Sequence, residues 1–172
     1  MSIPFGAAVL LRLHCRRAGA QAARTGEVTA MASFRGERFF LSNFSPCSVV
    51  WKGLDYLTVE HAYQAAKTNN HAWRLRIQAC LTPGQAKHLI RQAPLRVSWQ
   101  AERKDVMLAL LRVKFKPGSS FAELLLATAD EELVEVNEWG DCYWGVCRGV
   151  GENVLGKLLM RVRAELRVGV MP

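Results

Sequence analysis

The sequence lacks the features of membrane, fibrous and metal-binding proteins. No apolar run approaches the roughly 20 residues that span a bilayer, so we expect a cytoplasmic protein that contacts no membrane. No CxxC pair occurs, and the spacing of the cysteines and histidines matches no zinc pattern, so we expect no metal. Half of the residues are hydrophobic and 22% are charged, which is typical of a folded globular protein.

Two common catalytic frameworks are also absent. The chain has no GxGxxG motif and no alternation of strands and helices, which argues against a parallel sheet that binds a dinucleotide. Nothing resembles a Ser/His/Asp triad. The 172 residues suffice for one domain with a core and are too few for two ordinary domains. We therefore expect a single compact domain without a cofactor, and its oligomeric state stays open.

Acidic residues are scarce at the N-terminus. The first thirty residues contain four arginines and one glutamate, without a periodic apolar pattern. One interpretation, which we favour, is a translated upstream stretch with Met31 as the natural start. The other is an Arg-rich organelle transit peptide. We therefore expect residues 1–30 to be an extension that is disordered or not native, and residues 31–172 to form the domain.

The chain as a whole is basic. Its net charge is +8, and the part beyond residue 30 carries most of it. A positive domain favours anionic partners such as phosphates or nucleic acid.

Short strands are predicted from Phe39 onward. Residues 47–51 and 54–58 flank Lys52 and Gly53, and a glycine in a two-residue turn is typical of a β-hairpin. Another short strand is predicted at residues 133–137. The β component is therefore expected to be small and antiparallel.

Apolar periodicity and capping residues predict five helices, over residues 58–69, 83–92, 98–115, 121–128 and 153–167. Thr58 can cap the first of them. Thr82 and Gln85 form a capping box at the second, and Ser120 and Glu123 form another at the fourth. The predicted fold class is α+β, mainly α-helical.

A polar stripe lies along the first predicted helix. Glu60, Tyr63, Gln64 and Lys67 stand at i, i+3, i+4 and i+7, so they share one face. A stripe of acid, phenol, amide and amine can form the wall of an active site. A solvated face with ordinary helix pairs is the alternative, and periodicity alone leaves both open.

Two further segments can carry chemistry. Residues 139–145 hold two indoles, a phenol and an acid, which suits stacking on a flat base as well as the anchoring of an exposed strand. Residues 148–153 form a glycine-containing loop that leads into the last helix. Free amides, the helix dipole and Arg148 would make that loop a cradle for an anion.

These segments resemble one known family. Residues 39–44 and 58–67, Asp141-x-x-Trp144-Gly145 and residues 151–160 are similar in order and spacing to the YbiA-like (NADAR) family. The match covers about residues 34–167. The resemblance implies a compact, mainly helical domain that cleaves N-glycosidic bonds.

The family also indicates the substrate classes. Some members act on phosphoribosylamino-pyrimidine intermediates of riboflavin synthesis, and others remove ADP-ribose from guanine in nucleic acid. The resemblance therefore implies a small-molecule phosphoribosyl substrate, with ADP-ribosylated DNA as the alternative. A non-catalytic module that binds ADP-ribose or nucleic acid is the alternative of another class.

Cleavage of a C–N glycosidic bond needs particular groups. Positive charge builds on the ribose carbon, so a carboxylate beside it stabilises the transition state, and a second group must assist the departing nitrogen or activate water. Glu60, a glutamate that the family motif retains, is the first candidate, and the helix start should help to keep it ionised. Asp141 is the second carboxylate. Lys67 either contacts phosphate, the role we favour, or acts as an amine nucleophile toward the opened sugar.

The remaining site residues are expected to bind the substrate. Trp144 would stack on the base, and His61 is expected to pack beside Glu60 rather than to act as a base. Asn43 and Asn153 would supply orienting hydrogen bonds, although a helix cap suits Asn153 equally well. The full binding set is Asn43, Tyr63, Gln64, Trp144, Arg148, Gly151 and Asn153.

Overall fold

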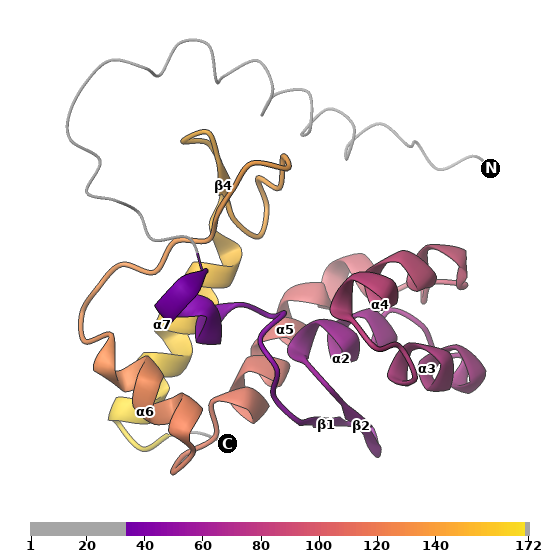
Figure 1. Cartoon of the computed structure of the whole chain (residues 1–172), viewed down its shortest axis with the longest axis horizontal. Helices are drawn as coiled ribbons and strands as arrows, with labels where there is room; N and C mark the ends of the chain where they lie inside the picture. Colours follow the sequence, from indigo (N-terminus) through magenta and orange to yellow (C-terminus); the bar gives the residue numbers. More distant parts are fainter. Residues whose placement is uncertain (1–33, 171–172) are drawn as a thin grey trace.

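Helices are the main regular elements of the described chain, and two small strand pairs accompany them (Figure 1). The computed structural model describes residues 34–170. The predicted extension at residues 1–30 lies outside the described residues. The prediction of a mainly helical α+β domain is confirmed. Across residues 34–170, no helix combines the length and the hydropathy needed to cross a membrane.

The predicted hairpin is present. Strand β1 (Val49–Trp51) pairs antiparallel with β2 (Leu54–Tyr56). The two turn residues, Lys52 and Gly53, both have positive φ, at 49° and 78°. This is the backbone that a two-residue hairpin turn requires, and glycine adopts it without strain.

The segment around Phe39 is helical, and the predicted strands begin after it. Residues Gly36–Leu41 form a 3₁₀ helix, η1, closed by the bond from the Ser42 amide to the Phe39 carbonyl (3.0 Å). A strand needs a neighbour to bond with, and the described part of the chain places none beside this segment. Leu41 is the only residue of η1 that is fully buried. A short 3₁₀ helix is enough to place this one side chain in the core.

Helix α2 (Val59–Ala65) lies at the centre of the packing. It contacts α3, α4, α5 and β1, and all seven of its residues are buried. Thr58 caps it as predicted, because the Thr58 hydroxyl accepts a hydrogen bond from the His61 amide (3.2 Å). The helix is shorter than predicted, and its polar stripe faces protein rather than solvent. The solvated-face alternative is therefore wrong.

Of the helices that pack beside α2, α4 was predicted and α3 was not. Helix α4 (Pro83–Leu89) continues into the 3₁₀ turn η2 (Ile90–Gln92), and its capping box is confirmed on both sides. Helix α3 (His71–Gln78) was missed. Of its residues only Ile77 is buried, so the apolar periodicity that signals a helix is almost absent.

The remaining helices form the other half of the molecule (Figure 1). Helix α5 (Trp99–Lys114) packs against α2 and α7 (Val154–Arg167), and α6 (Ser120–Ala127) packs against α7. Arg112 and Glu165 join α5 to α7 by two hydrogen bonds of 2.7 and 2.8 Å. The cap of α6 is Ser119 rather than Ser120, because the Ser119 hydroxyl accepts from the Ala122 amide (3.1 Å).

The second strand pair is parallel. Strand β3 (Val136–Asn137) lies beside β4 (Val146–Cys147), with Val136 opposite Val146. The small antiparallel component that was predicted is the hairpin of β1 and β2. The pair of β3 and β4 differs from it, because residues 138–145 loop back and restart the chain in the same direction. In Figure 1 this loop stands above the start of α7.

Candidate active site

Glu60 lies inside the protein, in the first turn of α2. Its side chain is 6% exposed, and its carboxylate accepts a hydrogen bond of 2.6 Å from the Gln64 side chain. Burial raises the pKa of Glu60. The Gln64 bond and the cations Lys87 and Lys67 oppose that rise, and Asp141 adds to it. The sequence suggested that the start of the helix would help to keep Glu60 ionised. Burial is instead the largest effect on the Glu60 pKa, and it acts in the opposite direction.

Aromatic rings cover the next turn of α2. The Tyr63 ring meets Trp99 and Trp144 edge to face, at centroid distances of 5.0 and 5.5 Å. Tyr143 packs edge to face on Trp144 at 5.0 Å. Tyr63 and Trp99 are buried, whereas Tyr143 and Trp144 are half-buried. The aromatic cluster therefore reaches the surface at the loop of residues 139–145.

Four cations surround this part of the molecule. The Lys67 ammonium lies 5.4 Å from the Tyr63 ring centre. Burial lowers the pKa of Lys67, and Lys87, Arg91 and Arg103 lower it further, while Glu60 raises it. Arg103 stacks over Tyr143, with its guanidinium carbon 3.6 Å from the ring centre. We call Lys67, Lys87, Arg91 and Arg103 the cation cluster.

Sequence reasoning found Lys67 but missed the other three members of the cluster. A signal existed for two of them, because Lys87 and Arg91 stand at i and i+4 of the predicted helix 83–92 and so share a face. Arg103 gave no such signal, since its place beside Tyr143 depends on contacts between distant segments.

Asp141 shapes the aromatic loop. One of its carboxylate oxygens accepts hydrogen bonds from the backbone amides of Tyr143 (3.1 Å) and Trp144 (2.9 Å). The Asn137 side chain holds the backbone of Asp141 through two bonds of 2.7 and 3.0 Å. Asp141 also raises the pKa of Glu60, so the two carboxylates lie within electrostatic reach of each other. The structure thus gives Asp141 a positioning role beside the predicted site.

The loop before α7, where the sequence suggested an anion cradle, offers fewer amides to a ligand than expected. The amides of residues 152–155 donate to the carbonyls of residues 142–145, at 2.8 to 3.3 Å, so they are not free to bind a ligand. Gly151 serves this contact, because a Cβ there would lie 2.1 Å from the Gly145 carbonyl oxygen. Arg148 is exposed at the tip of the loop.

The two predicted asparagines have different surroundings. Asn153 is 7% exposed, and its side chain bonds to the Glu135 amide (3.1 Å) and the Leu133 carbonyl (2.9 Å). It therefore holds the chain before β3 and caps no helix. Asn43 lies beside Glu60, whose amide donates to the Asn43 carbonyl (3.0 Å). The buried Asn43 Oδ1 has no partner among residues 34–170.

His61 behaves as expected for a packed residue. Its ring is fully buried, Nδ1 lies 2.8 Å from the Thr58 hydroxyl, and burial lowers its pKa. Within the described chain, no three His, Cys, Asp or Glu side chains are grouped as a metal would require.

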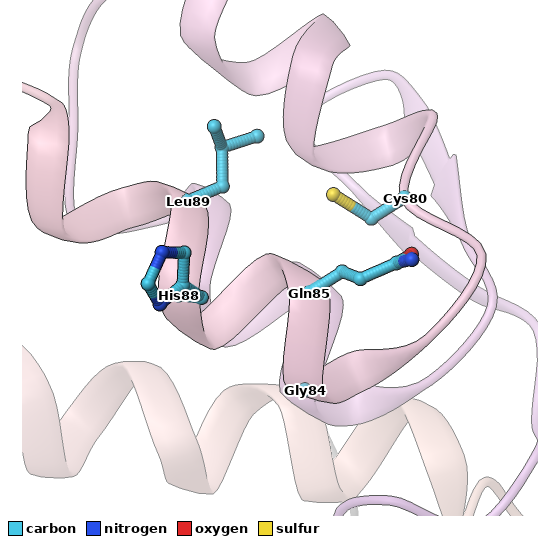
Figure 2. Close-up of a pocket in the computed structure, with 5 residues that line it drawn as sticks. All are labelled: Cys80, Gly84, Gln85, His88 and Leu89. Atoms are coloured by element: carbon cyan, nitrogen blue, oxygen red, sulfur yellow. The ribbon is translucent and has the colours of Figure 1, made fainter.

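A cavity of about 450 Å³ lies elsewhere, along α4 (Figure 2). It is lined by Cys80, Gly84, Gln85, His88 and Leu89. Figure 2 shows Cys80 Sγ and the Leu89 side chain facing the same space. No carboxylate lines it, so we do not place the reaction there.

Comparison with known proteins shows the family of the chain. The model of the NADAR domain matches residues 32–167. N-glycosidase YbiA of Escherichia coli (strain K12) is 38% identical over 130 residues, 74% of this chain and 81% of that protein. Riboflavin biosynthesis protein VVA0006 of Vibrio vulnificus (strain YJ016) is 38% identical over 131 residues, 74% of this chain and 35% of that protein.

The fold agrees as well. The NMR structure of E. coli YbiA matches with a TM-score of 0.72 and 35% sequence identity, over 80% of this chain and 83% of that one. The resemblance noted from the sequence is therefore confirmed, and the chain belongs to the NADAR domain family.

Proposed function

We propose that this protein hydrolyses the N-glycosidic bond between a phosphorylated ribose and a nitrogenous base, with a phosphoribosylamino-pyrimidine as its first candidate substrate. Its family and the relative named N-glycosidase YbiA identify it as an N-glycosidase. The relative named for riboflavin biosynthesis supports the choice of substrate, although this chain spans about a third of that protein.

One observation carries the proposal: a buried carboxylate, an aromatic cluster and four cations occur together. Glu60 is the carboxylate that would stabilise positive charge on the ribose carbon. The cation cluster would hold the phosphate, because exposed Lys87 and Arg91 and half-buried Lys67 and Arg103 place positive charge beside that carboxylate. The half-buried Tyr143 and Trp144 would receive the base.

The proposal is tested first by the products. Ribose 5-phosphate release from phosphoribosylamino-pyrimidines is measured beside ADP-ribose release from DNA carrying ADP-ribosylated guanine. We expect the first substrate to be turned over faster. Faster release of ADP-ribose from the DNA would show that modified nucleic acid is the better substrate. Binding of either substrate without release of a product would identify a non-catalytic module.

The cation cluster predicts a salt-dependent substrate affinity. Lys87→Ala and Arg91→Ala should each raise KM about 3- to 10-fold at low salt with little change in kcat, and the difference should shrink as salt rises. Lys104→Ala, an exposed lysine on α5 outside the cluster, is the matched control. Equal KM values for all three variants would remove the phosphate role.

The role of Lys67 can be tested separately from that of the other cations in the cluster. A half-buried amine with a lowered pKa beside Glu60 could either pair with phosphate or form an imine with the opened sugar. We favour pairing, so borohydride added during turnover should trap no sugar adduct on the protein. A covalent adduct in mass spectrometry that Lys67→Arg abolishes would contradict this and identify Lys67 as the nucleophile.

A further inference from the structure

Glu135 is a further carboxylate, which the sequence analysis did not identify as a site residue. Hydrogen bonds on both sides hold its backbone in place. It directly precedes β3, its amide donates to the Asn153 side chain (3.1 Å), and its carbonyl accepts from the Val146 amide (2.7 Å). Gly145 lies against it, because a Cβ at Gly145 would come within 2.2 Å of the Glu135 carbonyl oxygen and 3.0 Å of its Cγ. The side chain therefore starts from a rigid point next to the aromatic loop.

The carboxyl group of Glu135 is only partly satisfied. Its Oε2 atom is buried without a hydrogen-bond partner in the described part of the chain. Two charged groups face it, Asp141 from the aromatic loop and Arg35 from the segment before η1. Burial and the Asp141 charge raise the pKa of Glu135 to about 7, and Arg35 opposes the rise.

Asp141 and Glu135 differ in their hydrogen-bond partners. Two backbone amides donate to one Asp141 oxygen. Glu135 Oε2 receives no such donor, and a neutral carboxyl is the form that tolerates burial beside a negative charge. A buried carboxyl group that lacks a donor and lies beside a second carboxyl group is an arrangement that acid–base chemistry uses.

We propose that Glu135 is the proton donor to the departing nitrogen and then the base that activates water, with Asp141 as the residue that positions the loop and places a negative charge beside Glu135. This assignment rests on the proposed N-glycosidase reaction. It supplies the second group that the chemistry requires besides Glu60.

The steps balance. As the bond between the ribose carbon and nitrogen breaks, its electron pair goes to the nitrogen, which takes the proton of the Glu135 carboxyl. The ribose carbon is left cationic beside Glu60. Water then forms a bond to that carbon and gives a proton to the Glu135 carboxylate, which restores the acid for the next cycle.

The test is the pH profile of kcat for the full chain acting on a phosphoribosylamino-pyrimidine. Because the donor must be protonated, wild-type kcat should fall as the pH rises through about 7. Glu135→Gln should lower kcat about 10²- to 10⁴-fold, the range of a lost acid–base group, and should abolish this limb. Glu138→Gln, an exposed glutamate three residues further on, is the matched control and should behave as wild type.

A second variant tests the coupling. Asp141→Asn keeps an oxygen that can accept from the Tyr143 and Trp144 amides but removes the negative charge. The Glu135 pKa should then fall, so the alkaline limb should move to lower pH. A limb in the same place in both proteins would overturn the role given to Asp141.

The failures are distinguishable. If wild-type protein releases neither ribose 5-phosphate nor ADP-ribose, the proposed function fails and this assignment fails with it. If wild-type protein is active and Glu135→Gln keeps its rate and its alkaline limb, only the role of Glu135 is overturned. A lower melting temperature with an unchanged pH profile would likewise show a structural role alone.

Discussion

Replacing Glu60 by glutamine should lower kcat at least about 100-fold and leave KM close to that of the unchanged protein. The amide oxygen of glutamine can still accept the hydrogen bond from Gln64, so the packing around α2 is kept. What is lost is the negative charge that would stabilise the ribose cation in the transition state. An effect confined to kcat is expected, since that charge acts mainly when positive charge develops.

Steady-state kinetics and thermal melts of the same preparations check this result. Glu123→Gln on α6, an exposed glutamate far along the chain, is the control and should keep normal kcat. Glu60→Gln protein that is folded and still turns over within about threefold of normal would exclude Glu60 from the chemistry.

Adding a single methyl group at Gly156 should strongly destabilise the protein, although alanine normally favours a helix. The Cβ of alanine at this position in α7 would lie 2.0 Å from the Leu133 carbonyl oxygen and 2.6 Å from the Asn153 side chain. Backbone must then move, and overpacking of this kind costs at least about 2 kcal/mol, or roughly 4–8 °C in melting temperature for a chain of this size.

Gly84→Ala in α4 is the matched control, because the nearest atom to its added Cβ is the Thr82 hydroxyl at 3.9 Å. It should keep or raise the free energy of unfolding, by up to about 1 kcal/mol. Thermal melts of both variants decide the matter. Similar melting temperatures would mean that α7 does not lie so close to the chain before β3.

The sequence predicted the fold well where an element depends on interactions between residues close together in the chain. The capping box of Thr82 and Gln85 and the turn at Lys52 and Gly53 depend on neighbours within a few residues, and both are present as predicted. Helix α3 escaped detection because it buries almost nothing of its own, so its place is set by packing against α2 and α4. The serine cap of α6 was misplaced by one residue because two serines stand side by side.

The candidate site shows the same division. The stripe of α2 was recognised because helix periodicity joins its residues, but its burial could not be read from periodicity. At the cradle predicted over residues 148–153, carbonyls of another loop already accept from the amides of residues 152 and 153, which the sequence did not reveal. Glu135 was missed for a related reason, since Gly145 and Asp141 reach it only through the paired strands β3 and β4.

The most direct test of the central claim is a count of products from purified protein incubated with a phosphoribosylamino-pyrimidine. Free base and ribose 5-phosphate should appear in equal amounts and over many turnovers, and Glu60→Gln protein under the same conditions should release at most about a hundredth as much. Substrate recovered intact after it has bound, or equal release by both proteins, would contradict the assignment of this site to N-glycosidic hydrolysis.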